Sequence, residues 1–500
     1  MRSQATRQNP TGLNVSSSGQ DSAFMALIYA LVSVFFLMNA VLDVSWRLLW
    51  VVFGVIVVWS IVVTALRLVR FEAAHFDTCL FSFFIFFFVV LEPVVFALSG
   101  LDFPFPWGTE IRDNNVANGT GAIMSVFLMS YYAGRIPFNS RRRSRRNTEP
   151  SPPAGPQVRF TSRIVLFFSV LSTYPFFAFG SSGLVENLMI NITGRQTGYV
   201  AFSGGALGSS DPISVLIAQL IPVMVVLNAV MTATETKLSK KALHVLVFVF
   251  LFVLMISLGG RTWVVLVALT LLSILYFNST KLSDRLFFFV RFAFFMTIVI
   301  GALQYQIQQR NTGYSEASSS GFVGADMNRE IAFIYDTVPE QEDFVIAETF
   351  LEQVVLPVPT YLLLVITNPI PRIIWNGKPF DPSFVFVNEL RTGNTGLGTG
   401  SNVTVSIPGR AYVNFGWPGV IQYGFVLGLL LSQLARRMPH TSSVSALGMI
   451  YIFTICLIAV NFRELQAGKL YPIFWMIGVF LTQKVLNRVL RGYFHRSRVS

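Results

Sequence analysis

The chain has 500 residues, of which 53% are hydrophobic and only 12% are charged. Soluble domains carry about 25% charged residues, so this composition excludes a soluble protein and indicates an integral membrane protein. The formal net charge is +12. The two cysteines, Cys79 and Cys456, each lie inside an apolar run, so we expect neither a disulfide framework nor a thiolate metal site.

Membrane-spanning helices need about 20 mainly apolar residues, and this criterion finds candidates along most of the chain. The predicted spans are 23–41, 47–66, 78–99, 119–137, 163–182, 212–233, 243–258, 262–277, 286–303, 415–434, 444–462 and 469–486. The first span follows a polar tail and has no small-residue cleavage site, so we interpret it as a retained helix. The fourth span contains several polar residues. The sequence predicts an all-α polytopic protein with about 12 transmembrane helices.

The distribution of Lys and Arg predicts the orientation, because cytoplasmic loops are enriched in these residues. With the N-terminus inside, "RRRSRR", "KLSKK" and the basic C-terminal tail all fall inside, together with roughly two thirds of the 37 Lys and Arg. Both termini are therefore predicted to be cytoplasmic. This topology accounts for the positive charge, so no nucleic-acid partner is expected. Contact of "RRRSRR" with anionic lipid headgroups is the alternative.

The same alternation places residues 304–412 on the external face as one large loop. Within it, "VVLPVPTYLLLVITNPIP" resembles a thirteenth helix, but prolines 357, 359, 369 and 371 leave too short a run to span. We expect a re-entrant or interfacial element there. The chain thus divides into a nine-helix region over 1–303, the loop over 304–412 and three closing helices over 413–500.

The chemistry available to this loop is limited. "NELRTGNTGLGTGSN" is glycine-rich but lacks the Gly-Lys-Ser/Thr ending of a P-loop; a flexible loop and a backbone nest for an anion are both open interpretations. The histidines fall in cytoplasmic segments or at the cytoplasmic start of a span, which argues against an external zinc or Ser-His-Asp site. No cofactor and no metal are expected.

The loop carries six basic and eleven acidic residues, so an anion site there depends on a few placed arginines. Arginine binds phosphate oxygens through a planar fork and stays charged. Arg372 and Lys378 lie in the short turn "PRIIWNGKPF", where Trp375 suits the headgroup level. Arg261 in "SLGGRTWVV" is a second candidate; snorkelling towards the interface is its simpler explanation.

Three segments of the sequence resemble those of a known protein family. "NPIPRIIWNGKPF" resembles the Pro-Arg-x-x-Trp-x-x-Lys-Pro signature of bacterial oligosaccharide repeat-unit polymerases, the Wzy-type O-antigen and exopolysaccharide polymerases. "SIPGRAYVNFGWPGVIQYGFVLGLLL" is similar to the Tyr-x-Asn-Phe-Gly segment that follows it, and "GGRTWVV" to an earlier Gly-Arg-Thr turn. The matching covers roughly 245 to 430. Many members carry Glu before the Tyr-x-Asn-Phe-Gly segment, where this chain has Arg410-Ala411.

The resemblance implies a GT-C-like glycosyltransferase in the bacterial inner membrane, which transfers a glycan from undecaprenyl pyrophosphate to a new lipid-linked repeat unit. A chain-length regulator and a flippase are implied as partners, with membrane lipids around the helices. Arginines would stabilise the pyrophosphate leaving group, and a carboxylate would serve as general base. The implied catalytic residues are Arg261, Arg372, Glu389 and Arg410, and the implied substrate-binding residues are Arg329, Trp375, Lys378, Arg391, Tyr412 and Asn414.

Three rival functions are weighed against this expectation. An O-antigen ligase would share the bundle and the large loop, but it would be expected to use a loop histidine, which the chain lacks. A lipid-linked oligosaccharide flippase or other transporter would show paired halves and short loops. A structural or assembly protein would use the loop only to bind partners.

Overall fold

The computed structural model contains only helices as regular elements in the part of the chain that it describes. The described residues are 17–42, 44–69, 75–101, 114–136, 160–174, 216–257, 261–278, 406–437, 445–462 and 467–496, together with 283, 287, 290–292, 294, 297, 331, 332, 334, 335, 367 and 375.

Within these residues, six helices are long and apolar enough to cross a membrane, which confirms the multi-pass membrane class. They are α1 (Ser17–Val41), α2 (Arg47–Val69), the continuous rod of α3 (Phe76–Ile85), η2 (Phe86–Val90) and α4 (Leu91–Ser99), α11 (Ile221–Thr234) with the residues before it, α12 (Leu238–Ser257) and α19 (Ile407–Arg437). The number twelve stays a prediction, because span 286–303 and part of 163–182 lie largely outside the described residues.

The other helices also match predicted spans but miss the length or hydropathy of a full crossing. The shorter apolar helices are α7 (Ser162–Ser172), α13 (Arg261–Asn278) and α20 (Ala446–Val460), and the longer, more polar ones are α5 (Asn114–Gly134) and α21 (Tyr471–Arg496), the latter preceded by η5 (Ala467–Leu470). Helix α21 continues well past the predicted end at 486, because Lys and Arg are as compatible with a helix as apolar residues are.

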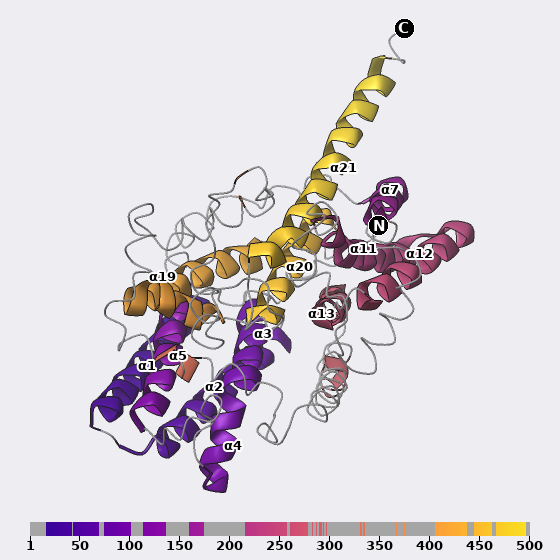
Figure 1. The fold of residues 1–500 in the computed structure, drawn as a ribbon. Coiled ribbons are helices and arrows are strands. Elements are labelled where there is room, and N and C mark those ends of the chain that lie inside the picture. The colour runs from indigo at the N-terminus through magenta and orange to yellow at the C-terminus, as the bar shows by residue number, and fades with distance from the viewer. Residues whose placement is uncertain are drawn as a thin grey trace, which may run out of the picture.

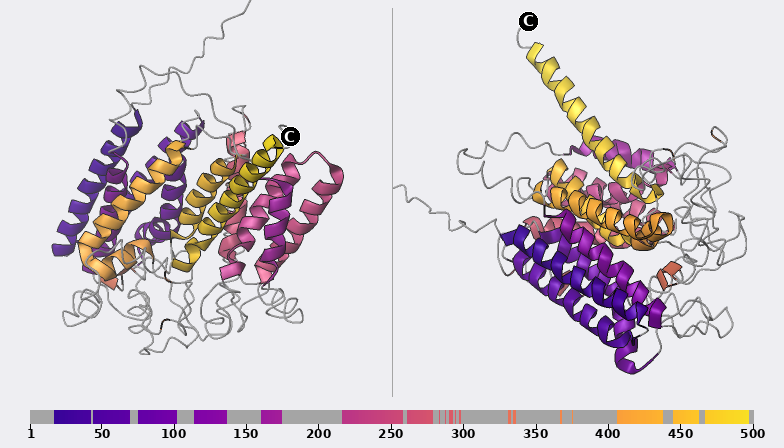
Figure 2. Two further views of the ribbon diagram at one scale, coloured as in Figure 1. Left: turned by 90° about the horizontal axis from the view of Figure 1, so that it is seen from above. Right: turned by 90° about the vertical axis from the view of Figure 1, so that its left-hand side faces the viewer.

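The helices form two groups that meet along α20. Figure 1 shows α1 to α5 on one side, α7, α11, α12 and α13 on the other, and α20 and α21 between them. Seen from above in Figure 2, the helices lie roughly alongside one another, and α5 packs against both α1 and α19. The C-terminal end of α21 projects beyond the bundle.

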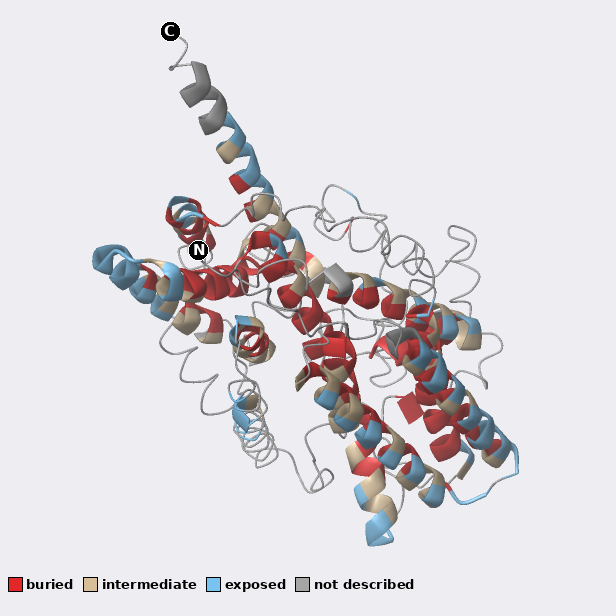
Figure 3. Cartoon of the chain, turned by 180° about the vertical axis from the view of Figure 1, so that it is seen from behind, coloured by how far each residue is buried: buried red, intermediate tan, exposed pale blue. Residues whose placement is uncertain are grey.

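Helix α5 is central to the first group, which explains why a polar sequence forms a helix here. Nearly all of its residues are buried, including Asn118, Thr120 and Ser125. Asn118 Nδ2 donates to the carbonyl of Val44 over 2.8 Å, and the hydroxyls of Thr120 and Ser125 donate to backbone carbonyls of α5 itself. The lipid-facing surface is supplied by outer helices, whose apolar side chains such as Leu246 on α12 are exposed (Figure 3).

Helices α5 and α19 run parallel and in close contact. A Cβ at Gly424 would lie 2.6 Å from the carbonyl oxygen of Phe127, and a Cβ at Gly428 would overlap the carbonyl of Tyr131. The contacts advance by four residues on both helices, so the two helices point in the same direction. Glycine is required at these positions because the backbones approach too closely for a side chain.

The rod from Phe76 to Ser99 stays continuous although it contains a proline. Pro93 cannot donate a backbone hydrogen bond, and its ring crowds the carbonyl four residues earlier. The turn η2, which has π-helical geometry, directly precedes this position and widens the backbone where the regular bonding pattern is interrupted. Glu92 and Pro93 are both buried there.

Candidate functional site

The Tyr-Val-Asn-Phe-Gly stretch forms a sharp break inside α19. Phe415 (φ −150°, ψ 17°) and Gly416 (φ 58°, ψ −146°) leave helical geometry and divide α19 into a short first segment and a long second one. Only glycine adopts the backbone of Gly416 without strain. A Cβ at Gly419 would overlap the carbonyl of Ala411. The short segment therefore folds back over the start of the long helix.

The short segment carries Arg410 and Tyr412, two predicted site residues, and buries both. Ser406 begins the segment as an N-cap, since its hydroxyl accepts a 3.1 Å bond from the Gly409 amide. Arg410 is 2% exposed and Tyr412 is 6% exposed. A guanidinium held away from bulk water attracts an anion more strongly than an exposed one.

Tyr412 is part of an aromatic group at the same end of the bundle. Its ring lies 5.3 Å from Trp417 in edge-to-face geometry and 6.2 Å from Tyr335. Burial, followed by the influence of Tyr335, raises the pKa of Tyr412 to about 12. Its hydroxyl therefore stays protonated at physiological pH and can donate a hydrogen bond to a ligand.

The structure describes only part of the predicted site. Trp375 is exposed, whereas Arg261 begins α13 and Asn414 lies in the short segment of α19, with side chains outside the described part. The predicted residues Arg329, Arg372, Lys378, Glu389 and Arg391 lie outside the described residues altogether. The structure thus places Arg410 and Tyr412 in one short buried segment of α19, and the roles of all the site residues stay predictions.

A second polar site, which the sequence analysis missed, lies at the opposite end of α5. Asp77 is 0% exposed and forms an ion pair with Arg135. Tyr131 Oη donates to the same carboxylate over 3.0 Å, and the Arg135 guanidinium lies 5.7 Å from the centre of the Tyr131 ring. Burying two charges is costly unless they are paired and further hydrogen-bonded, as they are here.

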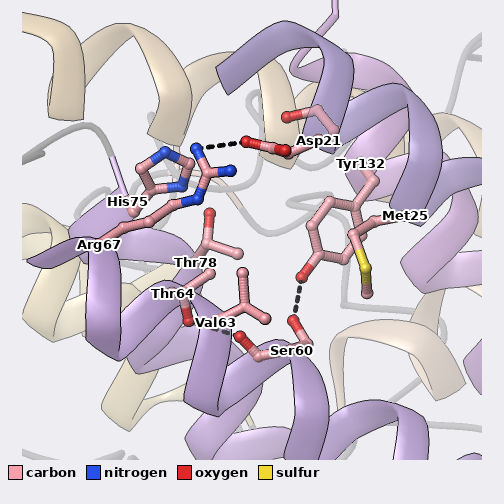
Figure 4. Close-up of a pocket in the computed structure, with 10 residues that line it drawn as sticks. Asp21, Met25, Ser60, Val63, Thr64, Arg67, His75, Thr78 and Tyr132 are labelled. Carbon is pink, nitrogen blue, oxygen red and sulfur yellow. Dashed lines mark hydrogen bonds and ion pairs between the residues drawn. The ribbon is translucent and has the colours of Figure 1, made fainter. Parts of the chain in front are cut away.

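A small cavity adjoins this ion pair between α1, α2, α3 and α5 (Figure 4). A second pair, Asp21 with Arg67 at 2.5 Å, lies at its edge and is partly exposed. Ser60 Oγ and Tyr132 Oη, 2.7 Å apart, line another wall. The cavity encloses about 30 Å³, which suits roughly one or two water molecules. In this conformation it is too small for a lipid-linked sugar.

His75 lies in this cavity as a neutral group. Burial, and then the positive charges of Arg135 and Arg67, lower the pKa of His75 to about 3. Its imidazole is therefore uncharged at physiological pH and able both to accept and to donate a hydrogen bond.

His244 has the hydrogen-bond pattern of a hydrolase triad but not the accessibility of one. Its Nε2 lies 2.8 Å from Ser162 Oγ, and its Nδ1 lies 2.7 Å from Asn228 Oδ1. His244 and Asn228 are 0% exposed and Ser162 is 9% exposed, so a substrate has no route to the serine. We interpret the group as a polar bridge that joins α7, α11 and α12.

One signal in the sequence could have pointed to the Asp77 site. Arg135 falls inside the predicted span 119–137, and Asp77 directly precedes the span 78–99. Ionisable residues at such positions pair with one another and often mark a functional site. Their pairing across 58 residues of sequence is a property of the packed helices.

Among the described residues, no group of three His, Cys, Asp or Glu side chains is arranged to hold a metal ion. Comparison of the chain with protein-family models, with curated proteins and with solved structures finds no match.

Proposed function

We propose that the protein polymerises oligosaccharide repeat units carried on a polyprenyl pyrophosphate. The observation that carries this proposal is the short segment of α19, where the left-handed Gly416 folds Arg410 and Tyr412 into the end of the bundle. This places a permanently charged fork and a protonated phenol next to the membrane-spanning helices. A lipid-linked pyrophosphate presents its charge at that depth while its tail lies along the bundle.

The parallel packing of α5 and α19 supports the predicted topology. In the twelve-span arrangement these helices are spans four and ten, which cross the membrane in the same direction. A thirteenth crossing within 354–371 would make them antiparallel, contrary to their glycine contacts. We infer that both termini are cytoplasmic in a bacterial inner membrane, and that Arg410 and Tyr412 face the outside.

The reaction would need no nucleotide sugar and no resident cofactor. The bond between the anomeric carbon of the donor glycan and its pyrophosphate oxygen breaks, and the acceptor hydroxyl oxygen bonds to that carbon. Arginines stabilise the charge that develops on the departing pyrophosphate. The hydroxyl proton passes to a base, for which Glu389 is the proposed carboxylate.

The polar cavity between α1, α2, α3 and α5 is the observation that would favour a transporter. Its volume of about 30 Å³ excludes a glycan in this conformation. Phe36, Trp50 and Phe53, whose rings lie 5.7–5.8 Å apart, pack farther along α1 and α2. A polar cavity of water size is a poor conduit for a sugar, so polymerisation is the better proposal.

The direct test uses purified protein in detergent with only a lipid-linked repeat unit. A polymerase produces a ladder of longer lipid-linked glycans, without nucleotide sugar and in the presence of EDTA. Arg410→Ala should lose the ladder and Arg410→Lys should restore it poorly, because one ammonium cannot replace a bidentate fork. Arg437→Ala, at the other end of the same helix, is the matched control. Absence of any ladder from folded protein and native substrate would refute the proposal.

A further inference from the structure

Residues 331, 332, 334 and 335, which lie between α13 and α19 in the sequence, are described and are packed into the protein. Ile331, Ala332 and Ile334 are each 0% exposed. Tyr335, which ends the piece, is half-buried and joins the hydrophobic core. This burial indicates a specific contact surface.

The contact surface for Tyr335 is built into one face of α5. A Cβ at Gly119 would overlap ring atoms Cε1 and Cζ of Tyr335. One helical turn earlier, Asn115 Oδ1 accepts a hydrogen bond of 3.4 Å from the Tyr335 hydroxyl. Residues four apart lie on the same helical face, so Gly119 makes the space for the ring and Asn115 contacts its tip.

Tyr335 also reaches the segment that carries Arg410. Its ring lies 6.2 Å from the Tyr412 ring at an angle of 33°, and Tyr412 in turn packs edge-to-face on Trp417. The ring therefore lies between α5 and the short segment of α19, and it contacts both. Tyr335 and Gly119 are 216 residues apart in sequence, so this contact joins two distant parts of the chain.

We propose that Tyr335 is a positioning residue, which docks its stretch of chain into the Gly119 socket and thereby holds it against the helical turn that bears Arg410. The socket is the space over Gly119, bounded by Asn115 and Tyr412. The ring supplies most of the contact, since the 3.4 Å hydrogen bond is long and lies at an exposed position. The effect on polymer synthesis rests on the proposed function, whereas the docking itself does not.

The docking can be tested without any activity. The test variant is Gly119→Cys/Tyr335→Cys, with Cys79 and Cys456 replaced by Ala. Without the ring, the space between the two backbones is free for a disulfide, and we expect the two Cβ atoms to lie at roughly the 3.5–4.5 Å separation that a disulfide requires. We expect rapid cross-linking on mild oxidation of the protein in membranes. Ala133→Cys/Tyr335→Cys is the control, because position 133 lies about 21 Å farther along α5. Failure of the first pair to cross-link, or equal cross-linking of both, would overturn the docking.

The positioning role is tested by steady-state kinetics of polymer formation. Tyr335→Ala should lower kcat at least about tenfold while the KM for the lipid-linked repeat unit changes less than about threefold, because the substrate itself is not bound by the ring. Tyr335→Phe should keep at least about half of the activity. Gly119→Leu should fill the socket and reproduce the loss from the opposite side of the contact.

The outcomes of the two experiments are separable. Wild-type kcat in folded Tyr335→Ala would overturn the positioning role, and so would a loss in Tyr335→Phe as large as in Tyr335→Ala. If the wild-type protein forms no polymer, the proposed function fails, and the cross-linking experiment alone then decides whether Tyr335 is docked in the socket.

Discussion

Removing one partner of the buried Asp77–Arg135 pair should destabilise the protein severely. The Asp77 side chain is 0% exposed and that of Arg135 is 7% exposed, so neither is exposed to bulk water when its partner is lost. An uncompensated buried charge typically costs about 3–5 kcal/mol. We expect a loss of that size in the free energy of unfolding for Asp77→Leu and for Arg135→Met.

The double variant Asp77→Leu/Arg135→Met should recover most of the loss, because replacing both charges by apolar groups leaves no unpaired ion. The coupling energy of this cycle should therefore exceed about 3 kcal/mol. The matched control is the Asp21–Arg67 pair, whose side chains are 35% and 21% exposed. Solvent screening should limit its coupling to about 1 kcal/mol or less.

Reversible unfolding in mixed micelles, followed by circular dichroism against the mole fraction of denaturing detergent, measures all four states of each cycle. A cost below about 1 kcal/mol for Asp77→Leu would contradict the reasoning. Equal coupling in the two cycles would do the same, because the larger coupling is expected from the burial of the Asp77–Arg135 pair.

Three further predictions concern pH, topology and the arginines of the predicted external loop. Folding lowers the pKa of His75 from 6.5 to about 3, so on acidification the unfolded state binds a proton before the folded state does. The free energy of unfolding should therefore fall as pH drops from 6.5 towards 3, by about 2 kcal/mol at pH 5. His75→Gln should flatten this pH dependence in unfolding titrations. Ser319→Cys should react with an impermeant maleimide in intact spheroplasts and Ser144→Cys should not, and equal labelling would contradict the topology. Arg372→Ala should abolish polymer without lowering protein level, whereas Arg142→Ala in the basic "RRRSRR" run should change little; full-length polymer from Arg372→Ala would return that residue to an interfacial anchor.

The sequence by itself determined the membrane class and most of the helix positions. The hydrocarbon core of a bilayer requires about 20 apolar residues in every spanning helix, and this requirement is local, so it can be recognised in a run such as the one that forms α2. The helix α5 was also predicted, although its span was placed at 119–137 and the helix is Asn114–Gly134. Hydropathy locates apolar residues, whereas the start of α5 is polar.

Parts of the candidate site were also visible in the sequence. The motif that contains Arg410 and Tyr412 predicts both as site residues, and the structure places both in the buried first segment of α19. Their burial was not predictable, because it depends on the break at Gly416 and on the close approach of Ala411 to Gly419. The Gly-Trp-Pro sequence predicts a turn but does not indicate the direction in which the chain turns.

Only the tertiary structure decided which polar residues are paired and which helices they join. Asp77 meets Arg135 across 58 residues, and Tyr335 meets α5 from a distant part of the chain. The sequence shows where a charge or a hydroxyl lies near a membrane-spanning segment, and burying such a group is unfavourable. The hydrogen bonds and ion pairs that offset this unfavourable energy come from partners on other helices. Because these partners depend on how helices pack around α5, the polar end of the bundle and the Tyr335 socket became visible only in three dimensions.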